Sequence, residues 1–186
     1  MAKFLRGLIA AGFGGQGVLL LGQIVAHGAM KEGKFVTWIP SYGPEMRGGT
    51  ANCSVAISDE EIGSPVVNQP DCLVIMNQPS LSKFEADLKP GGVLLYNSDL
   101  VTYPNQRKDI TVVAVPCNTI ALELGNEKVA NVITLGALAA SSDLVSVEGC
   151  KSTLAELMGK KKAALLEINM TAFDRGVEIA RKALGK

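Results

Sequence analysis

The chain has 186 residues, of which 47% are hydrophobic and 19% are charged, so it is long enough to bury a full hydrophobic core. Its 18 Lys and Arg side chains balance its 18 Asp and Glu side chains, and a zero net charge creates no basic field that would attract nucleic acid or an anionic membrane. We therefore expect a single domain over residues 1–186, with neither nucleic acid nor a membrane as its partner.

The first elements are predicted to be a strand, a glycine-rich turn and a helix. Leu5–Ala11 is a continuous apolar run, which is typical of a buried parallel strand. Gly17–Lys31 predicts a helix that is apolar nearly all round, so it should be buried on more than one side, with a partner subunit covering what the sheet does not. His27, the only histidine, is predicted to be a core residue of this helix.

The turn between them has the composition of an anion-binding loop. Glycines at Gly12, Gly14, Gly15 and Gly17, interrupted by Gln16, allow positive φ and close approach, while the N–H groups of the following helix start point into the same space. The spacing also satisfies the dinucleotide fingerprint. A Rossmann site, however, needs an acid at the end of the second strand, predicted over Phe35–Ile39, and none is present. A loop that faces another phosphate ligand or a partner is favoured over NAD binding, and pure packing is the third interpretation.

A second polar loop follows the second strand. Ser41–Thr50 contains glycines, a proline, a tyrosine and the charged residues Glu45 and Arg47, which makes it a candidate binding loop. Arg47 could bind a phosphate or carboxylate through two hydrogen bonds, or it could form a local ion pair with Glu45. An alternating strand over Thr50–Ser58 is predicted next, followed by a turn at Asp59–Glu61 and a returning strand over Ile62–Val67.

The second half alternates strands and helices before becoming helical. Asp71–Asn77, Val93–Tyr96 and Thr111–Val115 are predicted strands, and Ser80 is the predicted cap of a helix over Leu81–Leu88. Asn77 lies at the carboxyl end of its strand, where it would point toward the glycine loop if the two strands are neighbours. Further helices are predicted over 119–124, 129–141, 151–158 and 161–184. The pattern predicts an α/β, Rossmann-like three-layer domain with a mainly parallel sheet, an antiparallel hairpin addition and a helical C-terminal part.

The residues supply no convincing catalytic or metal centre. Cys53, Cys72, Cys117 and Cys150 are widely separated, which favours reduced core thiols over a zinc site or an iron–sulfur cluster. Lys3 and Arg6 before the first apolar run resemble a secretory signal, but the glycines interrupt that run early. We therefore expect a cytoplasmic protein that acts as one component of a larger enzyme.

Three stretches taken together resemble the gamma subunit of 2-oxoacid:ferredoxin oxidoreductases: Gly12–Gly17, Ser41–Asn52 and Met76–Pro79. The similarity extends over nearly the whole chain. The form of the second stretch is closer to the group that acts on 2-oxoglutarate, pyruvate or branched-chain 2-oxoacids than to the related indolepyruvate oxidoreductases.

The resemblance implies a complex that oxidatively decarboxylates a 2-oxoacid, with 2-oxoglutarate favoured, to an acyl-CoA while it reduces ferredoxin. It places thiamine diphosphate and the iron–sulfur clusters in partner subunits of the same complex, which has alpha and beta subunits and optionally a delta subunit. This chain would hold no cofactor tightly and would not be catalytic alone. In isolation it could form a homodimer.

The resemblance also implies that coenzyme A passes this subunit. In that hypothesis the glycine loop offers backbone N–H groups, Arg47 holds a phosphate and Asn77 adds a side-chain contact. The alternatives are a scaffold subunit that uses the same loops only for docking, and a nucleotide-binding Rossmann-like module. The candidate binding residues are Gly12, Gly14, Gly15, Gln16, Gly17, Tyr42, Arg47, Gly48, Gly49, Asn52 and Asn77.

Overall fold

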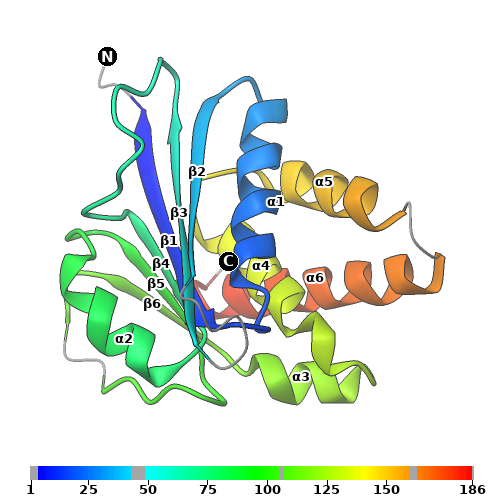
Figure 1. Cartoon of the computed structure of the whole chain (residues 1–186). Coiled ribbons are helices and arrows are strands. Elements are labelled where there is room, and N and C mark those ends of the chain that lie inside the picture. The colour runs from blue at the N-terminus through cyan, green and yellow to red at the C-terminus, as the bar shows by residue number, and fades with distance from the viewer. Residues whose placement is uncertain (1–3, 43–48, 105–106, 160–162, 186) are drawn as a thin grey trace.

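A computed structural model describes residues 4–42, 49–104, 107–159 and 163–185 (Figure 1). Strands and helices alternate along the first part of the chain, and four α-helices end it. The elements are β1 (Leu5–Phe13), α1 (Val18–Lys31), β2 (Phe35–Tyr42), β3 (Thr50–Ser58), β4 (Cys72–Ile75), α2 (Gln78–Phe84), the 3-10 helix η1 (Glu85–Asp87), β5 (Val93–Asn97), β6 (Thr111–Val115), α3 (Cys117–Glu123), the 3-10 helix η2 (Glu127–Val129), α4 (Ala130–Ser141), α5 (Val147–Gly159) and α6 (Ala163–Ala183).

The strands form one six-stranded sheet in the order β2-β3-β1-β4-β5-β6. β1, β4, β5 and β6 are mutually parallel. β3 is antiparallel to both of its neighbours, β1 and β2. The predicted α/β fold with a mainly parallel sheet is therefore confirmed, and its antiparallel strand lies inside the sheet, between β2 and β1.

Helices cover both faces of this sheet, which gives the predicted three layers (Figure 1). α1, α4, α5 and α6 lie on one face and α2 lies on the other. Successive side chains of β1 point to opposite faces of the sheet. Leu8 and Ala10 belong to the large core under α1, whereas Ile9 and Ala11 belong to a smaller core under α2. Because both faces of β1 are covered, its apolar run is continuous.

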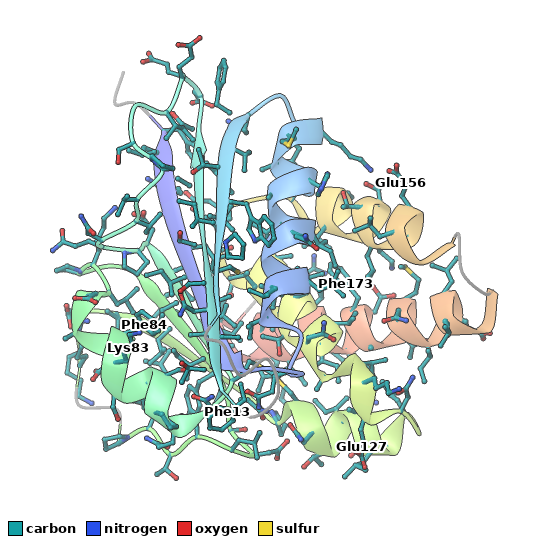
Figure 2. The ribbon with its side chains drawn as sticks, in the orientation of Figure 1. Phe13, Lys83, Phe84, Glu127, Glu156 and Phe173 are labelled. Carbon is teal, nitrogen blue, oxygen red and sulfur yellow. The ribbon has the colours of Figure 1, made fainter. Side chains whose placement is uncertain are left out.

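Two helices of the large face approach each other at a pair of glycines. A Cβ atom on Gly176 of α6 would fall on the carbonyl oxygen of Ile133 in α4, and one on Gly136 of α4 would fall on the carbonyl oxygen of Phe173. Phe173 itself is fully buried in the helical layer (Figure 2). The backbones of α4 and α6 are therefore in direct contact.

The predicted return from the Asp59–Glu61 turn into a strand is wrong. Ile62–Val67 forms no strand, and the antiparallel partner of β3 is β2, which precedes it in the chain. Both edges of β3 are already paired, with β1 on one side and β2 on the other, so no edge is left for a returning strand. Val67 instead packs against the smaller core.

The environment of α1 also differs from the prediction. His27 is exposed, so the prediction of a core histidine is wrong. The buried residues of α1 are on the sides of the helix that face the sheet and the other helices, and His27 is not among them. α1 is covered by α5 and α4 of the same chain. Much of its apolar surface is therefore covered within the chain, while Leu19 and Leu20 stay half-buried beside the glycine loop.

The cysteines support a prediction about pH. All four are buried and free, as predicted, and burial raises the pKa of Cys53 to about 11 and those of Cys72, Cys117 and Cys150 to about 12. An unfolded thiol has a pKa of about 8.5, so above that pH the unfolded chain releases protons that the folded chain keeps. We expect stability that is unaffected by these thiols below about pH 8.5 and falls as the pH rises toward 11–12.

Urea unfolding of the wild type and of Cys150→Ala between about pH 7.5 and about pH 10.5 measures this effect. This range includes the pKa of a thiol in the unfolded chain, about 8.5. The variant should lose stability less steeply with pH than the wild type does. Equal slopes in the two proteins would contradict the prediction.

Candidate functional site

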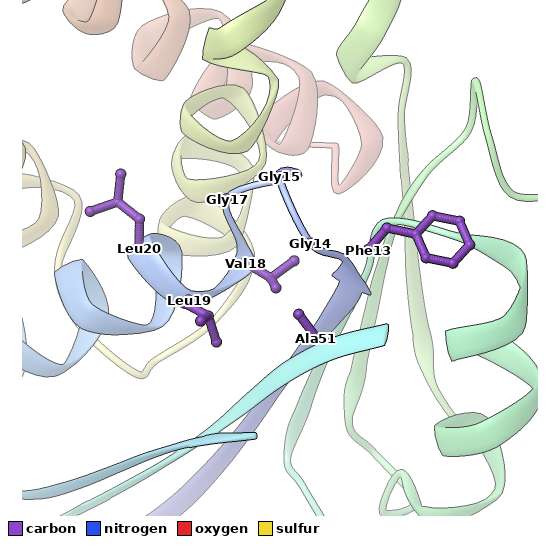
Figure 3. A pocket seen from close by; sticks show the side chains of 8 residues that line it. All are labelled: Phe13, Gly14, Gly15, Gly17, Val18, Leu19, Leu20 and Ala51. Carbon is purple, nitrogen blue, oxygen red and sulfur yellow. The ribbon is translucent and has the colours of Figure 1, made fainter. Parts of the chain in front are cut away.

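The loop Gly14–Gly17, called the glycine loop below, joins β1 to α1 (Figure 3). Gly17 is the N-cap of α1 with φ 75° and ψ 17°, and Gly15 has φ 100°. Both values lie in the left-handed region, which favours glycine. Because the cap has no side-chain hydrogen bond, the first-turn N–H groups of Val18, Leu19 and Leu20 have neither a side-chain cap nor an intrahelical acceptor. Such a helix start favours an anion or a polar acceptor.

The side chain of Gln16 fixes the loop to two strands. Its Oε1 accepts a hydrogen bond from the N–H of Phe13 at 2.6 Å, and its Nε2 donates to the carbonyl of Met76 at 2.9 Å. Both ends of the amide are therefore occupied by the protein. A Cβ on Gly12 would lie 2.7 Å from this Oε1, so the small size of Gly12 serves packing under Gln16.

Among the described residues, a backbone hydrogen bond joins the two predicted binding loops. The N–H of Gly14 donates to the carbonyl of Gly49 at 2.9 Å, and the N–H of Gln16 donates to the carbonyl of Phe13 at 3.1 Å. The N–H groups of Gly14 and Gln16 are thus already hydrogen-bonded to carbonyls of the protein itself. Asn52 is half-buried on β3, opposite Ala11 of β1.

The described residues include only the two ends of the second predicted loop. Tyr42 is the last residue of β2, paired with Ala51 of β3. Arg47 and Gly48 lie outside the described residues, so their predicted contacts stay predictions.

Asn77 is the cap of the helix that follows β4, so the prediction that Ser80 caps it is wrong. Its Oδ1 accepts a hydrogen bond from the N–H of Ser80 at 2.9 Å. The cap lies at Asn77 because Pro79 follows within the first turn, where a missing N–H is tolerated. The side chain is 3% exposed, and its Nδ2 is buried without a hydrogen-bond partner. Asn77 directly follows Met76, the residue that Gln16 holds.

One contact of the glycine loop was missed from the sequence. Asn131, in the first turn of α4, is 9% exposed, and its Nδ2 donates to the carbonyl of Gly17 at 3.4 Å. A Cβ on Gly17 would collide with this side chain. One turn later the buried hydroxyl of Thr134 bonds to the carbonyl of Ala130 at 2.9 Å. Polar residues spaced three apart inside an otherwise apolar helix were the available signal.

A cavity of about 460 Å³ opens beside the glycine loop, within the size range of small-molecule sites (Figure 3). None of the described residues that line it is charged. The cavity can accept a mainly apolar ligand that also carries hydrogen-bond acceptors, which the N–H groups at the start of α1 could bind. Its described lining is Phe13, Gly14, Gly15, Gly17, Val18, Leu19, Leu20 and Ala51.

Within the described ranges, no three His, Cys, Asp or Glu side chains are grouped so that they could hold a metal ion. None of the helices in those ranges is long and apolar enough to cross a membrane.

A mainly parallel sheet with a glycine loop and a helix start at the end of β1 defines a Rossmann-like domain, a class of fold in which ligands bind at this edge of the sheet. The chain belongs to the pyruvate ferredoxin/flavodoxin oxidoreductase family, which matches residues 7–179.

Two relatives and one solved structure locate the chain within this family. The ketoisovalerate oxidoreductase subunit VorA of Methanothermobacter marburgensis is 39% identical over 94% of this chain, which spans only 36% of VorA. The 2-oxoglutarate synthase subunit KorC of Methanocaldococcus jannaschii is 37% identical over 97% of this chain and 96% of KorC. The crystal structure of a keto/oxoacid ferredoxin oxidoreductase gamma subunit from Geobacter sulfurreducens is 37% identical, with a TM-score of 0.79 over 95% of this chain and 99% of that one.

Proposed function

We propose that the chain is the gamma-type subunit of a cytoplasmic 2-oxoacid:ferredoxin oxidoreductase. The observation that carries the proposal is the similarity to KorC along nearly the full length of both chains, together with the matching gamma-subunit structure. In the proposed reaction the 2-oxoacid loses carbon dioxide and two electrons, its acyl group joins the thiol of coenzyme A, and the electrons pass to ferredoxin. The KorC relatives favour 2-oxoglutarate, while VorA keeps a branched-chain 2-oxoacid as the competing substrate.

The chain's own part in this reaction is proposed to be assembly and contact with coenzyme A. Thiamine diphosphate and the iron–sulfur clusters are assigned to partner subunits, namely alpha, beta and an optional delta subunit. The assignment of the clusters agrees with the four cysteines of this chain, which are buried and free in the core. The uncharged cavity suits the amide-bearing arm of coenzyme A, whose carbonyl oxygens could accept hydrogen bonds from the first turn of α1. Arg47, two residues before Gly49, is proposed to hold a phosphate of the same ligand.

A scaffold role is the second candidate, and the apolar lining of the cavity favours it. Leu19 and Leu20 are only half-buried beside the glycine loop, as expected of a surface that a partner subunit covers. A dinucleotide-binding module is less compatible with the fold. β3 separates β2 from β1, so the end of β2 is not beside the strand that carries the glycine loop.

Anaerobic purification of the tagged native chain, with identification of its partners, tests the proposal. The recovered complex should reduce a viologen dye only when coenzyme A and a 2-oxoacid are present, with the highest kcat/KM for 2-oxoglutarate in a panel that includes pyruvate and 2-oxoisovalerate. Recovery of the chain without partners or activity would overturn the assignment as an oxidoreductase subunit.

The coenzyme A contact is tested separately with Arg47→Ala in the assembled complex. Loss of a charge-assisted bond to phosphate should raise the apparent KM for coenzyme A by roughly tenfold or more, with kcat little changed. Arg181→Ala, at an exposed position near the end of α6, is the matched control. An unchanged KM in an intact complex would leave the scaffold role.

A further inference from the structure

β2 is an edge strand with unusually little protection. Among the described residues nothing pairs with its outer side (Figure 1). Its sequence, FVTWIPSY, contains no charged residue, and the side chains of Phe35 and Ile39 are 47% and 38% exposed. Proteins normally block such an edge with charges, bulges or a covering element, because an open edge recruits another strand. Pro40 is the one such device in this strand.

The two faces of β2 have different surroundings. Val36 and Trp38 pack against the large core under α1. Since side chains alternate along a strand, Phe35, Thr37 and Ile39 lie on the opposite face. The hydroxyl of Thr37, at the centre of that face, is buried and has no hydrogen-bond partner.

The backbone groups that point outward can be identified from the hydrogen bonds of β1. The carbonyls of Gly7 and Ala11 accept hydrogen bonds from the N–H groups of Asp71 and Met76, on the β4 side of β1. Backbone groups of successive residues in a strand point to opposite sides, so the N–H and C=O groups of Leu8 and Ala10 point toward β3. Carrying this alternation through the two antiparallel registers turns the N–H and C=O groups of Thr37 toward β3. Those of Val36 and Trp38, and the C=O of Pro40, then point out of the sheet.

We propose that two copies of this chain pair antiparallel along β2, with a two-fold axis at Thr37. This register places Val36 opposite Trp38 of the second copy, and each such pair can exchange two N–H to C=O hydrogen bonds. On the other face it places Phe35 opposite Ile39 of the second copy, a favourable aromatic to β-branched pair. Thr37 lies opposite Thr37 of the second copy, where the two hydroxyls can bond and supply the missing partner.

The same register explains where the pairing ends. The next outward position, Pro40, has no N–H, and it would lie opposite Lys34 of the second copy. Lys34 already forms an ion pair with Asp59 of its own chain, so no unpaired charge enters the interface. Pairing is therefore confined to Phe35–Ile39.

Pairing of β2 with β2 of a second copy is favoured over pairing of β2 with the edge strand at the other end of the sheet. β6, five residues long, ends the sheet on the opposite side. Pairing β2 of one copy with β6 of the next would be heterologous and could continue into an open filament, whereas β2 with β2 closes after two chains. The self-complementary sequence around Thr37 supports the closed arrangement.

Cross-linking tests the register directly. Thr37 would form a non-hydrogen-bonded pair across the axis, with Cα atoms about 4.5 Å apart, within the range that a disulfide bridges. Thr37→Cys should therefore form a disulfide-linked dimer under mild oxidation of the full-length chain, read on a non-reducing gel. Phe35→Cys, on the same face but far from its own copy, should not. The native thiols are buried and do not interfere.

Sedimentation of the wild type provides an independent measurement. The chain should dimerise as its concentration rises, and Ile39→Lys should raise the dimer dissociation constant by roughly tenfold or more, because it removes two cross-strand pairs. Leu122→Lys, at a 61% exposed position on α3, should leave that constant unchanged. A chain that stays monomeric, a dimer that tolerates Ile39→Lys, or equal cross-linking by the two cysteine variants would overturn the proposal. So would protection of β2 amides from hydrogen exchange only in the assembled oxidoreductase, which would assign the edge to another subunit.

Discussion

Gly176→Ala is expected to lower the free energy of unfolding by about 3 kcal/mol or more, which corresponds to a fall in Tm of roughly 6–12 °C for a chain of this size. The added methyl group would fall on the carbonyl oxygen of Ile133. That atom belongs to the backbone of α4, so no side-chain rotation can make room. The helices must move apart, and the packing of fully buried Phe173 would be loosened with them.

Thermal and urea unfolding of the purified chain measure this loss. Gly63→Ala is the matched control, because no atom lies within 4 Å of the position that its Cβ would take. It should leave Tm nearly unchanged. Gly136→Ala should resemble Gly176→Ala, and the double variant should cost less than the sum, because one separation of the helices relieves both collisions. A Tm for Gly176→Ala within a degree or two of the wild type would show that the two helices do not touch as described.

The local elements were predictable because burial leaves a clear pattern along the chain. The continuous apolar run of β1 and the alternation of β3 follow from whether one or both faces of a strand are covered. The order of the strands was not predictable in the same way. The alternation in β3 indicates that one face of the strand is buried, but it does not indicate that both edges are paired with other strands. For this reason a returning strand over Ile62–Val67 was predicted wrongly.

The candidate site shows the same division. Four glycines were predicted to allow positive φ. Gly15 and Gly17 take it in the tight strand-to-helix turn, whereas Gly12 and Gly14 do not. Gln16 was grouped with them as a ligand contact, yet its amide bonds to Phe13 and to Met76. The second of these bonds depends on β4 lying beside β1, 60 residues apart in the chain. No local pattern reports such a neighbour.

Asn131 was missed for a related reason. It stands in an apolar helix far from the loop in sequence, and only the packing of α4 brings it to Gly17. Together, Gln16 and Asn131 hold the glycine loop from two sides. The loop is thus fixed by the protein's own side chains, whatever ligand or partner meets its outer surface.

Gly17→Ala is expected to have the second large effect, about 2–5 kcal/mol, because two separate costs add. The left-handed backbone at φ 75° costs roughly 1–2 kcal/mol for any residue with a Cβ. The same Cβ also collides with the side chain of Asn131, a steric cost of about 1–3 kcal/mol in a packed site. Gly15→Ala separates the two terms. Its φ is 100°, but no atom lies near the position of its Cβ, so it should show the backbone cost alone.

A double-variant cycle with Asn131→Ala completes the test. Asn131→Ala removes the amide group, whose Nδ2 and Cγ would lie 2.4 and 2.7 Å from a Cβ on Gly17, but it keeps the Cβ at 2.9 Å. Gly17→Ala should therefore cost less in the Asn131→Ala background than in the wild type, and still more than Gly15→Ala does. Urea unfolding of the four proteins of the cycle gives the coupling energy. If Gly17→Ala costs the same in both backgrounds, the amide group of Asn131 does not press on the loop. A double variant that costs less than the sum of the single variants would instead show that the packing of α4 restricts the start of α1 at the candidate site.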